Sequence, residues 1–441
     1  MEQIREKLLH GDYTSVEIDS RKVQPGSLFV ALKGNHVDGA DYIDDAIRRG
    51  ATGIISSRKD AKTQRNSLGA LASLREVSDS LQALQDLARD YLDSIPNLLR
   101  IGITGSVGKT TVKEITGSIF RQAMPTAVSP GNMNSETGLP LAAFKVKPTD
   151  KAAIFEMASD HPGEMAGLAQ IVRPSIACIT LIGTAHIEMF GTKEKILEEK
   201  KDIFSLFDKN DIALIPAWEP MRDQLARGLK GRVIYYGNIL EAKSEETGYT
   251  WEGKPVSFAL SGAHNWRNAI AAASIAQAAG IDDETIVKGL EAVQPIAGRS
   301  EIVDTILAGK HITLIRDYYN ANPDSLNAAF DLIAGLDADK PVKRRKVYVL
   351  GSMLELGAFS REAHRNAGRR LAAMHSNAVF LFGKEMEDAA GEILDEKAGP
   401  VFWTCDMDTL KDALFSSLQD NDIVLIKGSR ACALERIENV S

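Results

Sequence analysis

A lysine and two threonines follow a glycine-containing turn in the segment Thr104-Gly105-Ser106-Val107-Gly108-Lys109-Thr110-Thr111. Such a turn between a strand and a helix lets backbone N–H groups approach phosphate closely, and the helix adds the positive end of its dipole. We expect Lys109 to meet the β- and γ-phosphates of a nucleotide and the Thr110 hydroxyl to help hold Mg²⁺. The strict phosphate-loop pattern has glycine where Ile103 stands, and the alternative is a chance Gly-Lys-Thr in a turn.

Two more polar side chains follow apolar runs that read as strands. Glu156 ends the run Ala152–Glu156, and His186 lies in a turn after Ile176–Ile182. Strands of one parallel sheet present their carboxyl ends at the same edge, where ligands bind. One carboxylate, one hydroxyl and one imidazole are a sparse but workable set for Mg²⁺, which keeps water and substrate phosphates as its other ligands. The alternative is that the histidine is structural.

Strand and helix patterns alternate in three regions, which predicts an α/β protein. We expect three domains at 1–97, 98–299 and 300–441, joined by linkers near Ser94–Asn97 and Gln294–Arg299. The expected strands are Leu28–Leu32, Gly53–Ser56, Leu99–Thr104, Ala152–Glu156, Ile176–Ile182, Ile212–Ile215, Ile312–Ile315, Arg345–Leu350, Ala378–Phe382 and Asp422–Ile426. The expected helices are Tyr42–Arg49, Val77–Leu92, Thr110–Gln122, Glu194–Phe207 and Trp266–Ala279. The central region reads as a doubly wound parallel sheet and the last as a Rossmann-type domain.

Composition narrows the class of protein. The chain has 441 residues, 44% of them hydrophobic, and a net charge of −8 that is spread along the sequence. This charge argues against nucleic acid or an anionic membrane as the main partner. The three cysteines lie far apart and no run approaches the roughly 18 apolar residues of a membrane span, so we expect a cytoplasmic protein with reduced thiols.

The loop Thr-Gly-x-x-Gly-Lys-Thr-Thr resembles that of the Mur ligase family, which builds the peptidoglycan stem peptide and includes folylpolyglutamate synthetases. Segments similar to other family motifs lie in order on both sides of the loop, from about Ile18 to Arg430. They are Asp19–Lys22, Pro25–Gly34, Gly131–Pro140, Glu156-Met157, Thr184–Gly191, Glu194–Phe204, Gly262–Ala269, Pro295–Arg299, Asp317–Ser325, Leu350–Gly357 and Lys427–Arg430. The ordered series is far more specific than the loop alone.

The resemblance implies a small N-terminal UDP-substrate domain, a central parallel-sheet ATPase domain and a C-terminal Rossmann-like domain. It implies catalytic roles for Lys109, Glu156, His186 and Lys200, and Mg²⁺ binding by Thr110, Glu156, His186 and Lys200. Nucleotide contacts would come from Thr104, Gly105, Gly108, Lys109, Thr110, Thr111, Asn268, Arg299, Asp317 and Asn320. Substrate contacts would come from Ser20, Arg21, Lys33, Asn132, Asn134, Lys427, Ser429 and Arg430.

Two of these roles have particular alternatives, and a third depends on domain closure. Lys200 would carry a carbamate formed with CO₂, which turns a cation into an anion able to hold a second Mg²⁺, and the neighbouring Lys201 is the other choice. Asn268 would reach the adenine, while Asn265 reads equally well as the cap of an alanine-rich helix. Arg299 would contact phosphate when the domains close about the hinge near it.

The activity implied is the ATP-dependent addition of D-alanyl-D-alanine to UDP-N-acetylmuramoyl-tripeptide through an acyl phosphate. Asn-Ala-Asn-Pro, Met-x-Glu-Leu-Gly and Lys-Gly-Ser-Arg resemble the motifs of the family members with this activity. We expect a monomer whose partners are these two substrates. The third residue of the tripeptide, lysine or diaminopimelate, stays open. The sequence departs from the motifs at Ala40, Arg316, Tyr318 and Ser352.

Three other functions are alternatives to the addition of D-alanyl-D-alanine. The family member that adds the third residue is the nearest, but its diaminopimelate-specific Asp-Asn-Pro-Arg motif is absent from the sequence. A phosphate-loop ATPase or kinase would use the same loop without forming an amide. A non-catalytic relative that binds nucleotide or UDP-sugar would account for the departures at Arg316, Tyr318 and Ser352.

Overall fold

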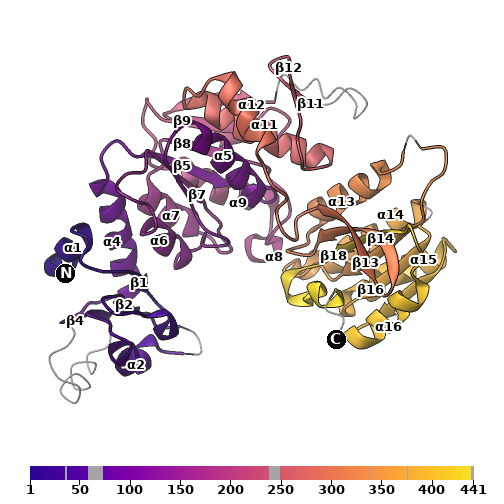
Figure 1. Ribbon diagram of the computed structural model, residues 1–441, viewed down its shortest axis with the longest axis horizontal. Helices are drawn as coiled ribbons and strands as arrows, with labels where there is room; N and C mark the ends of the chain where they lie inside the picture. The colour runs from indigo at the N-terminus through magenta and orange to yellow at the C-terminus, as the bar shows by residue number, and fades with distance from the viewer. Residues whose placement is uncertain (35–36, 58–72, 238–248, 339, 375, 439–441) are drawn as a thin grey trace.

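The computed structural model describes residues 1–34, 37–57, 73–237, 249–338, 340–374 and 376–438. Three α/β bodies follow one another along the long axis of the molecule, in chain order (Figure 1). The α/β class with a parallel central sheet is therefore confirmed. No helix of the described segments is long and apolar enough to cross a membrane.

The N-terminal body is a small parallel sheet of four strands in the order β1-β2-β3-β4. Helix α2 (Ile43–Arg48) packs on one face, and helices α1 (Glu2–Leu9) and α4 (Ser80–Ser94) pack on the other. Helix α4 begins three residues after the predicted Val77, because the Asp79 side chain caps it by accepting from the N–H groups of the first turn. The strands are Val16–Glu17, Leu28–Ala31, Gly53–Ser56 and Ser73–Glu76.

The central body is a parallel sheet of six strands in the order β10-β9-β8-β5-β7-β6. The chain passes from β5 to strands on one side of it and then to strands on the other, so the topological switch lies at the carboxyl end of β5, where α/β sheets bind ligands. The strands are β5 (Leu99–Thr104), β6 (Thr126–Val128), β7 (Ala152–Glu156), β8 (Ile176–Ile179), β9 (Ile212–Pro216) and β10 (Arg232–Tyr236).

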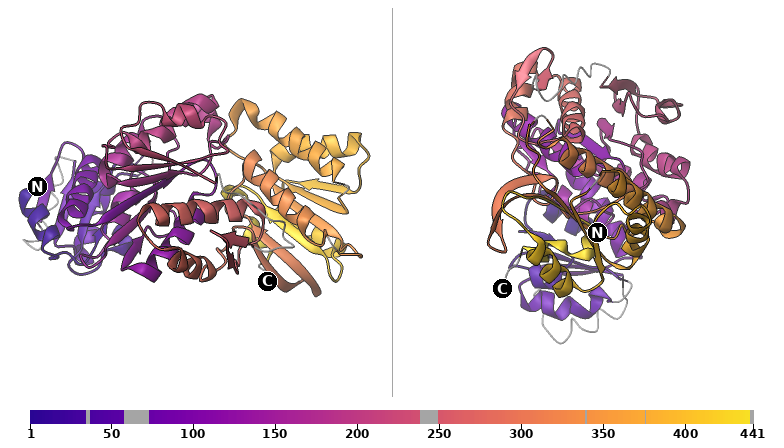
Figure 2. Two further views of the ribbon diagram at one scale, coloured as in Figure 1. Left: turned by 90° about the horizontal axis from the view of Figure 1, so that it is seen from above. Right: turned by 90° about the vertical axis from the view of Figure 1, so that its right-hand side faces the viewer.

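Helices cover both faces of this sheet (Figure 2). One face packs against α5 (Lys109–Ala123), α11 (Ala263–Ala278) and α12 (Asp283–Glu291). The other face packs against α6 (Gly138–Ala143), α7 (Glu164–Val172) and α9 (Lys193–Lys201). The helix predicted at Glu194–Phe207 is therefore shorter than expected, since α9 ends at Lys201 and a 3₁₀ turn at Asp202–Phe204 buries Ile203 and Phe204. A short hairpin, β11 (Tyr249–Trp251) with β12 (Lys254–Val256), precedes α11.

The C-terminal body is a six-stranded sheet in the order β13-β14-β18-β15-β16-β17, in which only the pairing of β13 with β14 is antiparallel. Four of its strands were predicted, whereas the edge strands β13 and β17 were not. The strands are β13 (Glu301–Leu307), β14 (Lys310–Asp317), β15 (Lys346–Gly351), β16 (Ala378–Phe382), β17 (Val401–Thr404) and β18 (Ile423–Lys427). The helices are α13 (Pro323–Gly335), α14 (Ser360–Ala373), α15 (Glu387–Asp395) and α16 (Met407–Ser417).

Candidate active site

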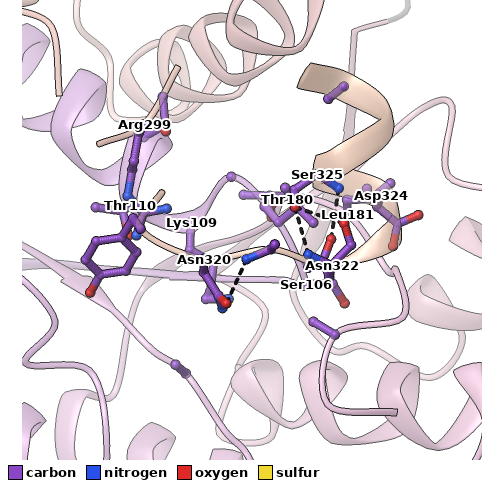
Figure 3. A pocket seen from close by; sticks show the side chains of 18 of the residues that line it. Ser106, Lys109, Thr110, Thr180, Leu181, Arg299, Asn320, Asn322, Asp324 and Ser325 are labelled. Atoms are coloured by element: carbon purple, nitrogen blue, oxygen red, sulfur yellow. Dashed lines mark hydrogen bonds between the residues drawn. The ribbon is translucent and has the colours of Figure 1, made fainter. Parts of the chain in front are cut away.

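A cleft of about 1130 Å³ lies between the central and C-terminal bodies. The central body lines the cleft with the turn from β5 to α5, and the C-terminal body lines it with the loop that leads into α13. Figure 3 shows Lys109 and Thr110 close to Arg299 and Asn320, with Ser106 facing the start of α13. The cleft thus brings together residues of two bodies that lie some 200 positions apart in the chain.

The phosphate loop owes its shape to two glycines with positive φ. Gly105 has φ 142°, and a side chain there would collide with the Thr180 hydroxyl oxygen. Gly108, with φ 89°, starts α5 and lies against the amide of Asn268. Lys109 donates through Nζ to the Gly105 carbonyl at 2.8 Å, folding over the loop. Burial lowers the pKa of Lys109, although the Glu156 carboxylate opposes that shift.

Ile103, the departure from the strict phosphate-loop pattern, is fully buried in β5 with the core beneath α5 and α11. The loop proper starts only after it, at Gly105, so a side chain at position 103 faces the core and leaves the loop free. Thr104 is also fully buried, and its hydroxyl oxygen has no hydrogen-bond partner among the described residues.

Glu156 is held at the carboxyl end of β7 by two neighbours in the cleft. The Thr110 hydroxyl donates to its Oε2 at 2.7 Å, and the Asn134 amide donates to its Oε1 at 2.8 Å. Asn132 lines the cleft on the same loop as Asn134. The described residues hold no cluster of three or more His, Cys, Asp or Glu side chains able to bind a metal ion. One carboxylate beside one hydroxyl fits Mg²⁺, which takes its remaining ligands from phosphate and water.

The structure distinguishes Lys200 from Lys201. Lys200 is 3% exposed and donates to the carbonyl and the hydroxyl of Ser159 at 2.9 and 2.8 Å. Burial, reinforced by the charge of Lys109, lowers the pKa of Lys200 to about 7. Lys201 points the other way, toward the carbonyls of Gln224 and Arg227. Lys200 lies behind the cleft wall, because its partner Ser159 directly precedes Asp160, which lines the cleft.

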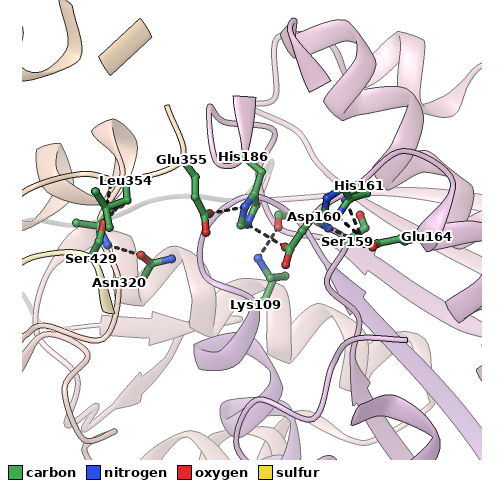
Figure 4. A network of polar contacts seen from close by, with 12 residues as sticks. Lys109, Ser159, Asp160, His161, Glu164, His186, Asn320, Leu354, Glu355 and Ser429 are labelled. Carbon is green, nitrogen blue, oxygen red and sulfur yellow. Dashed lines mark hydrogen bonds and ion pairs between the residues drawn. The ribbon is translucent and has the colours of Figure 1, made fainter. Parts of the chain in front are cut away.

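His186 is held between two carboxylates (Figure 4). Its Nε2 lies 3.3 Å from Asp160 Oδ1, and its Nδ1 lies 2.7 Å from Oε2 of Glu355 in the C-terminal body. The contact with His186 lowers the pKa of Glu355. Both ring nitrogens are therefore engaged, so the ring must release one carboxylate before it can bind a metal. The motif around Glu355 was noticed in the sequence, but its contact with His186 was not.

The C-terminal wall of the cleft is organised around Lys427, which is 2% exposed. Lys427 Nζ lies 2.7 Å from Asp317 Oδ2 and donates to the Asn320 carbonyl at 3.0 Å. Asp317 also accepts from the N–H of Ser300 in the linker. The predicted hinge residue Arg299 stacks on the ring of Tyr319, 4.1 Å from its centroid. Ser429 and Arg430 line the cleft as well, Ser429 accepting from the N–H of Leu354.

Two of the three departures in the C-terminal motifs, Arg316 and Tyr318, have local explanations, whereas nothing in the structure explains Ser352. Arg316 pairs with Glu438, with its Nε donating at 2.8 Å and its Nη2 at 2.6 Å to the same oxygen. Tyr318 packs against Gly298 of the linker, and burial raises its pKa to about 12. Ser352 is buried at the end of β15, where its carbonyl accepts from the N–H of Ser429.

On the side of Gly108 the cleft is lined by the start of α11 and by Trp218, a part that we call the second compartment. Asn268 touches the phosphate loop and donates weakly to Asn265 Oδ1 at 3.4 Å. The prediction that Asn265 caps the helix is wrong, because α11 starts after Gly262 and the Asn265 amide donates instead to the Ser261 carbonyl. Trp218 lines this compartment and stands edge-on to Tyr236. Sequence reasoning missed Trp218, since a single tryptophan in a loop gives no signal.

The residues predicted to bind the UDP moiety lie in the N-terminal body, outside this cleft. Arg21 pairs with Asp19, donating from Nη2 at 2.8 Å, and this contact lowers the pKa of Asp19 to about 2. Ser20 is 5% exposed. Lys33 bridges to Asp38 through the backbone. The structure brings these three residues together on one small body but gives no contact between them and the cleft.

Two bodies also touch directly beside the phosphate loop. Asp324, in the first turn of α13, accepts through one oxygen from the N–H and the hydroxyl of Thr184 at 2.9 and 3.1 Å. Gly183 makes this approach possible, because an added Cβ there would lie 2.3 Å from the Asp324 carboxylate and 3.2 Å from Ser106 Cβ. Asp324 belongs to the motif-like segment Asp317–Ser325, but nothing in the sequence indicates that it reaches the other body.

Comparisons with known proteins bear on the whole chain. Residues 12–92 match the Mur ligase family catalytic domain, 103–276 the Mur ligase middle domain and 298–430 the Mur ligase glutamate ligase domain. The UDP-N-acetylmuramoyl-tripeptide–D-alanyl-D-alanine ligase of Treponema pallidum is 37% identical, with 97% of this chain and 93% of that protein covered. The ligase of the same name from Escherichia coli is 30% identical, with 96% and 92% covered.

Solved structures give the same answer. A crystal structure of MurF from Acinetobacter baumannii superposes with a TM-score of 0.83 at 27% identity, covering 98% of this chain and 97% of that one. The MurF ligase of Thermotoga maritima in complex with ADP gives 0.78 at 26% identity, covering 98% and 96%. The three family domains match in order, the cleft lies between two of them, and the relatives are similar over nearly their full length. The chain therefore belongs to the Mur ligase family.

Proposed function

We propose that the protein joins the terminal carboxylate of UDP-N-acetylmuramoyl-tripeptide to the amine of D-alanyl-D-alanine, at the expense of ATP. The observation that carries this proposal is the cleft itself, in which the phosphate loop and Glu156 of one body face Lys427, Asp317 and Asn320 of another. The relatives over the full chain length carry this activity in their names. Product formation from tripeptides that carry lysine or diaminopimelate will identify the third residue of the substrate.

The reaction needs an activated carboxylate, because an oxide is too poor a leaving group for amine attack. A carboxylate oxygen attacks the γ-phosphorus, ADP leaves, and the acyl phosphate then loses inorganic phosphate as the amine adds to the carbonyl carbon. Phosphoryl transfer depends mainly on positioning and charge neutralisation. Lys109 lies over the phosphate loop, and we propose that it meets the β- and γ-phosphates there. The backbone N–H groups from Gly105 to Thr111 would surround these phosphates at the start of α5.

Mg²⁺ fits beside Thr110 and Glu156, where it supplies positive charge against the phosphates. His186 and a carbamylated Lys200 are the further ligands that we propose. Lys200 is suited to carbamylation, because an amine with a pKa of about 7 is largely uncharged in mildly alkaline solution and only the uncharged form reacts with CO₂.

The substrates are divided between bodies. Ser20, Arg21 and Lys33 of the N-terminal body are proposed to hold the UDP moiety. Asn132 and Asn134 line the cleft and are proposed to lie beside the reacting carboxylate. We further propose that Asn268 and Trp218, which line the cleft, flank the adenine. Lys427, Ser429 and Arg430 line it from the C-terminal side and are proposed to receive the incoming dipeptide. Closure about the linker near Arg299 brings the three groups together.

The acyl-phosphate step is tested by oxygen transfer. UDP-N-acetylmuramoyl-tripeptide labelled with ¹⁸O in its terminal carboxylate is incubated with ATP, Mg²⁺ and D-alanyl-D-alanine, and the released phosphate is weighed by mass spectrometry. One ¹⁸O per phosphate is expected for each amide formed. An ATPase that hydrolyses ATP with water leaves the phosphate unlabelled, and that result would exclude the proposed reaction.

A further inference from the structure

Lys113 is a buried cation that the reaction above does not use. It lies one turn after Lys109 on α5, and its side chain is 0% exposed. Two lysines four residues apart on one helix repel each other. An ammonium group withdrawn from water also needs charged or hydrogen-bonding partners to compensate for its lost hydration.

Those partners lie around the candidate metal site. Lys113 Nζ donates to the carbonyls of Ser129 and Gly131 at 2.9 and 3.1 Å. It also lies 3.0 Å from a carboxylate oxygen of Glu114 and 3.9 Å from Oε2 of Glu156. One ammonium group therefore joins α5, the loop after β6 and the end of β7.

Glu156 is tied to the same loop by two further hydrogen bonds. Its backbone N–H donates to the Ser129 hydroxyl at 3.1 Å, so that Ser129 is held by Lys113 through its carbonyl and holds Glu156 through its side chain. Farther along the loop, the Asn134 amide donates to the other carboxylate oxygen of Glu156. The position and orientation of Glu156 thus depend on where Lys113 holds the loop.

We propose that Lys113 is a positioning residue, which sets the Glu156 carboxylate and the 129–134 loop in the geometry that Mg²⁺-nucleotide requires. This inference rests on the proposed function, since it concerns the same metal site. Lys113 touches neither the reacting atoms nor the cleft. Groups that orient a metal ligand affect metal binding while leaving metal-free contacts with the ligand intact.

The test compares ADP affinity in excess Mg²⁺ with ADP affinity in EDTA, by isothermal titration calorimetry on the whole chain. The ratio of the two is the metal-linked gain. In Lys113→Met, which keeps the length of the side chain but removes its charge and donors, we expect this gain to fall about 10–100-fold. The affinity in EDTA, which depends on the phosphate loop, is expected to stay close to that of the unaltered protein.

A matched control is Ile119→Val, a buried position on the same helix whose side chain packs in the core beneath α11. It loosens α5 without touching the loop, so its metal-linked gain is expected to be unchanged even if its melting temperature falls. A gain in Lys113→Met that matches that of the control would overturn the inference. If Lys113→Met does not fold, Ser129→Ala decides, and an unchanged gain in that variant has the same meaning.

The two proposals fail differently in this experiment. If the unaltered protein shows no metal-linked gain at all, the proposed function fails and this inference falls with it. If the unaltered protein shows the gain and Lys113→Met keeps it, only the role of Lys113 is lost.

Discussion

Removing the Asp324 carboxylate should weaken closure of the C-terminal body on the central body. In the structure a single oxygen of Asp324 accepts two hydrogen bonds from Thr184, and the missing side chain of Gly183 lets it approach. The alanine side chain in Asp324→Ala ends at Cβ and offers no acceptor for these two bonds. Opening therefore becomes easier, while the phosphate loop and the metal site keep their own contacts.

The size of the effect follows from the two bonds. A hydrogen bond to a charged group contributes about 1.5–3 kcal/mol. Both bonds share one oxygen and are only partly buried, and water replaces them on opening, so we take about 2 kcal/mol for the pair. This corresponds to a shift of about 30-fold in the equilibrium between closed and open forms. The apparent affinity for ligands that bind the closed form is expected to fall by a similar factor.

Single-molecule fluorescence transfer measures closure directly. One dye is placed on the exposed Cys405 of the C-terminal body and the other on Lys209→Cys of the central body, with Cys432→Ser in the background and Cys178 buried. Asp324→Ala should reduce the high-transfer population in the presence of an ATP analogue and UDP-substrate. Asp324→Asn keeps one acceptor oxygen, so its high-transfer population should lie between those of the unaltered protein and Asp324→Ala.

The control for helix effects is Asp408→Ala. Asp408 occupies the same second position in the first turn of α16 that Asp324 occupies in α13, but it is exposed on the surface. Its removal costs the same favourable interaction with a helix N-terminus and should leave closure unchanged. If Asp324→Ala closes as readily as Asp408→Ala does, the contact with Thr184 has no part in closure and the reasoning fails.

Three other outcomes are expected. Lys109→Ala should lower kcat by about 100–1,000-fold, since it removes one charged donor from the phosphates, and unchanged turnover would exclude the role assigned to Lys109. Burial lowers the pKa of Lys200 to about 7 in the folded protein, below its pKa in the unfolded chain. Between these two pKa values the folded state binds fewer protons than the unfolded state. The free energy of unfolding, relative to Lys200→Met, should therefore rise by about 1 kcal/mol per pH unit from pH 7 to 9 in urea titrations, and parallel pH profiles would contradict the buried, uncharged amine. Binding of ADP should quench the intrinsic tryptophan fluorescence, and Trp218→Phe should remove most of that change. The reason is that Trp218 lines the cleft, while Trp251 and Trp266 are buried. A quench that persists in Trp218→Phe would place the adenine base elsewhere.

Much of this arrangement was predictable because it depends on local patterns. The turn at Gly105 and Gly108 needs positive φ and close backbone packing, and glycine at those positions is visible in the sequence. Glu156 was found because it ends a strand of uniformly apolar residues, which buried parallel strands require.

Other features depend on how distant segments meet, and the sequence carries no local sign of them. Lys200 and Lys201 are alike in type and adjacent in position, and only the packing of α9 decides which of them is buried. The ion pair between Arg316 and Glu438 explains why arginine stands where the family motif has another residue. Asp324 and Glu355 act across two bodies, and their partners are fixed by the relative placement of those bodies.

The central claim is that ATP is consumed to form an amide between two defined substrates. The most direct measurement incubates the protein with ATP, Mg²⁺, D-alanyl-D-alanine and UDP-N-acetylmuramoyl-tripeptide carrying lysine or diaminopimelate, and then weighs the products by mass spectrometry. A product heavier than the tripeptide by one dipeptide less one water, formed in step with phosphate, is the predicted result. Phosphate release without that product, from either tripeptide, would contradict it.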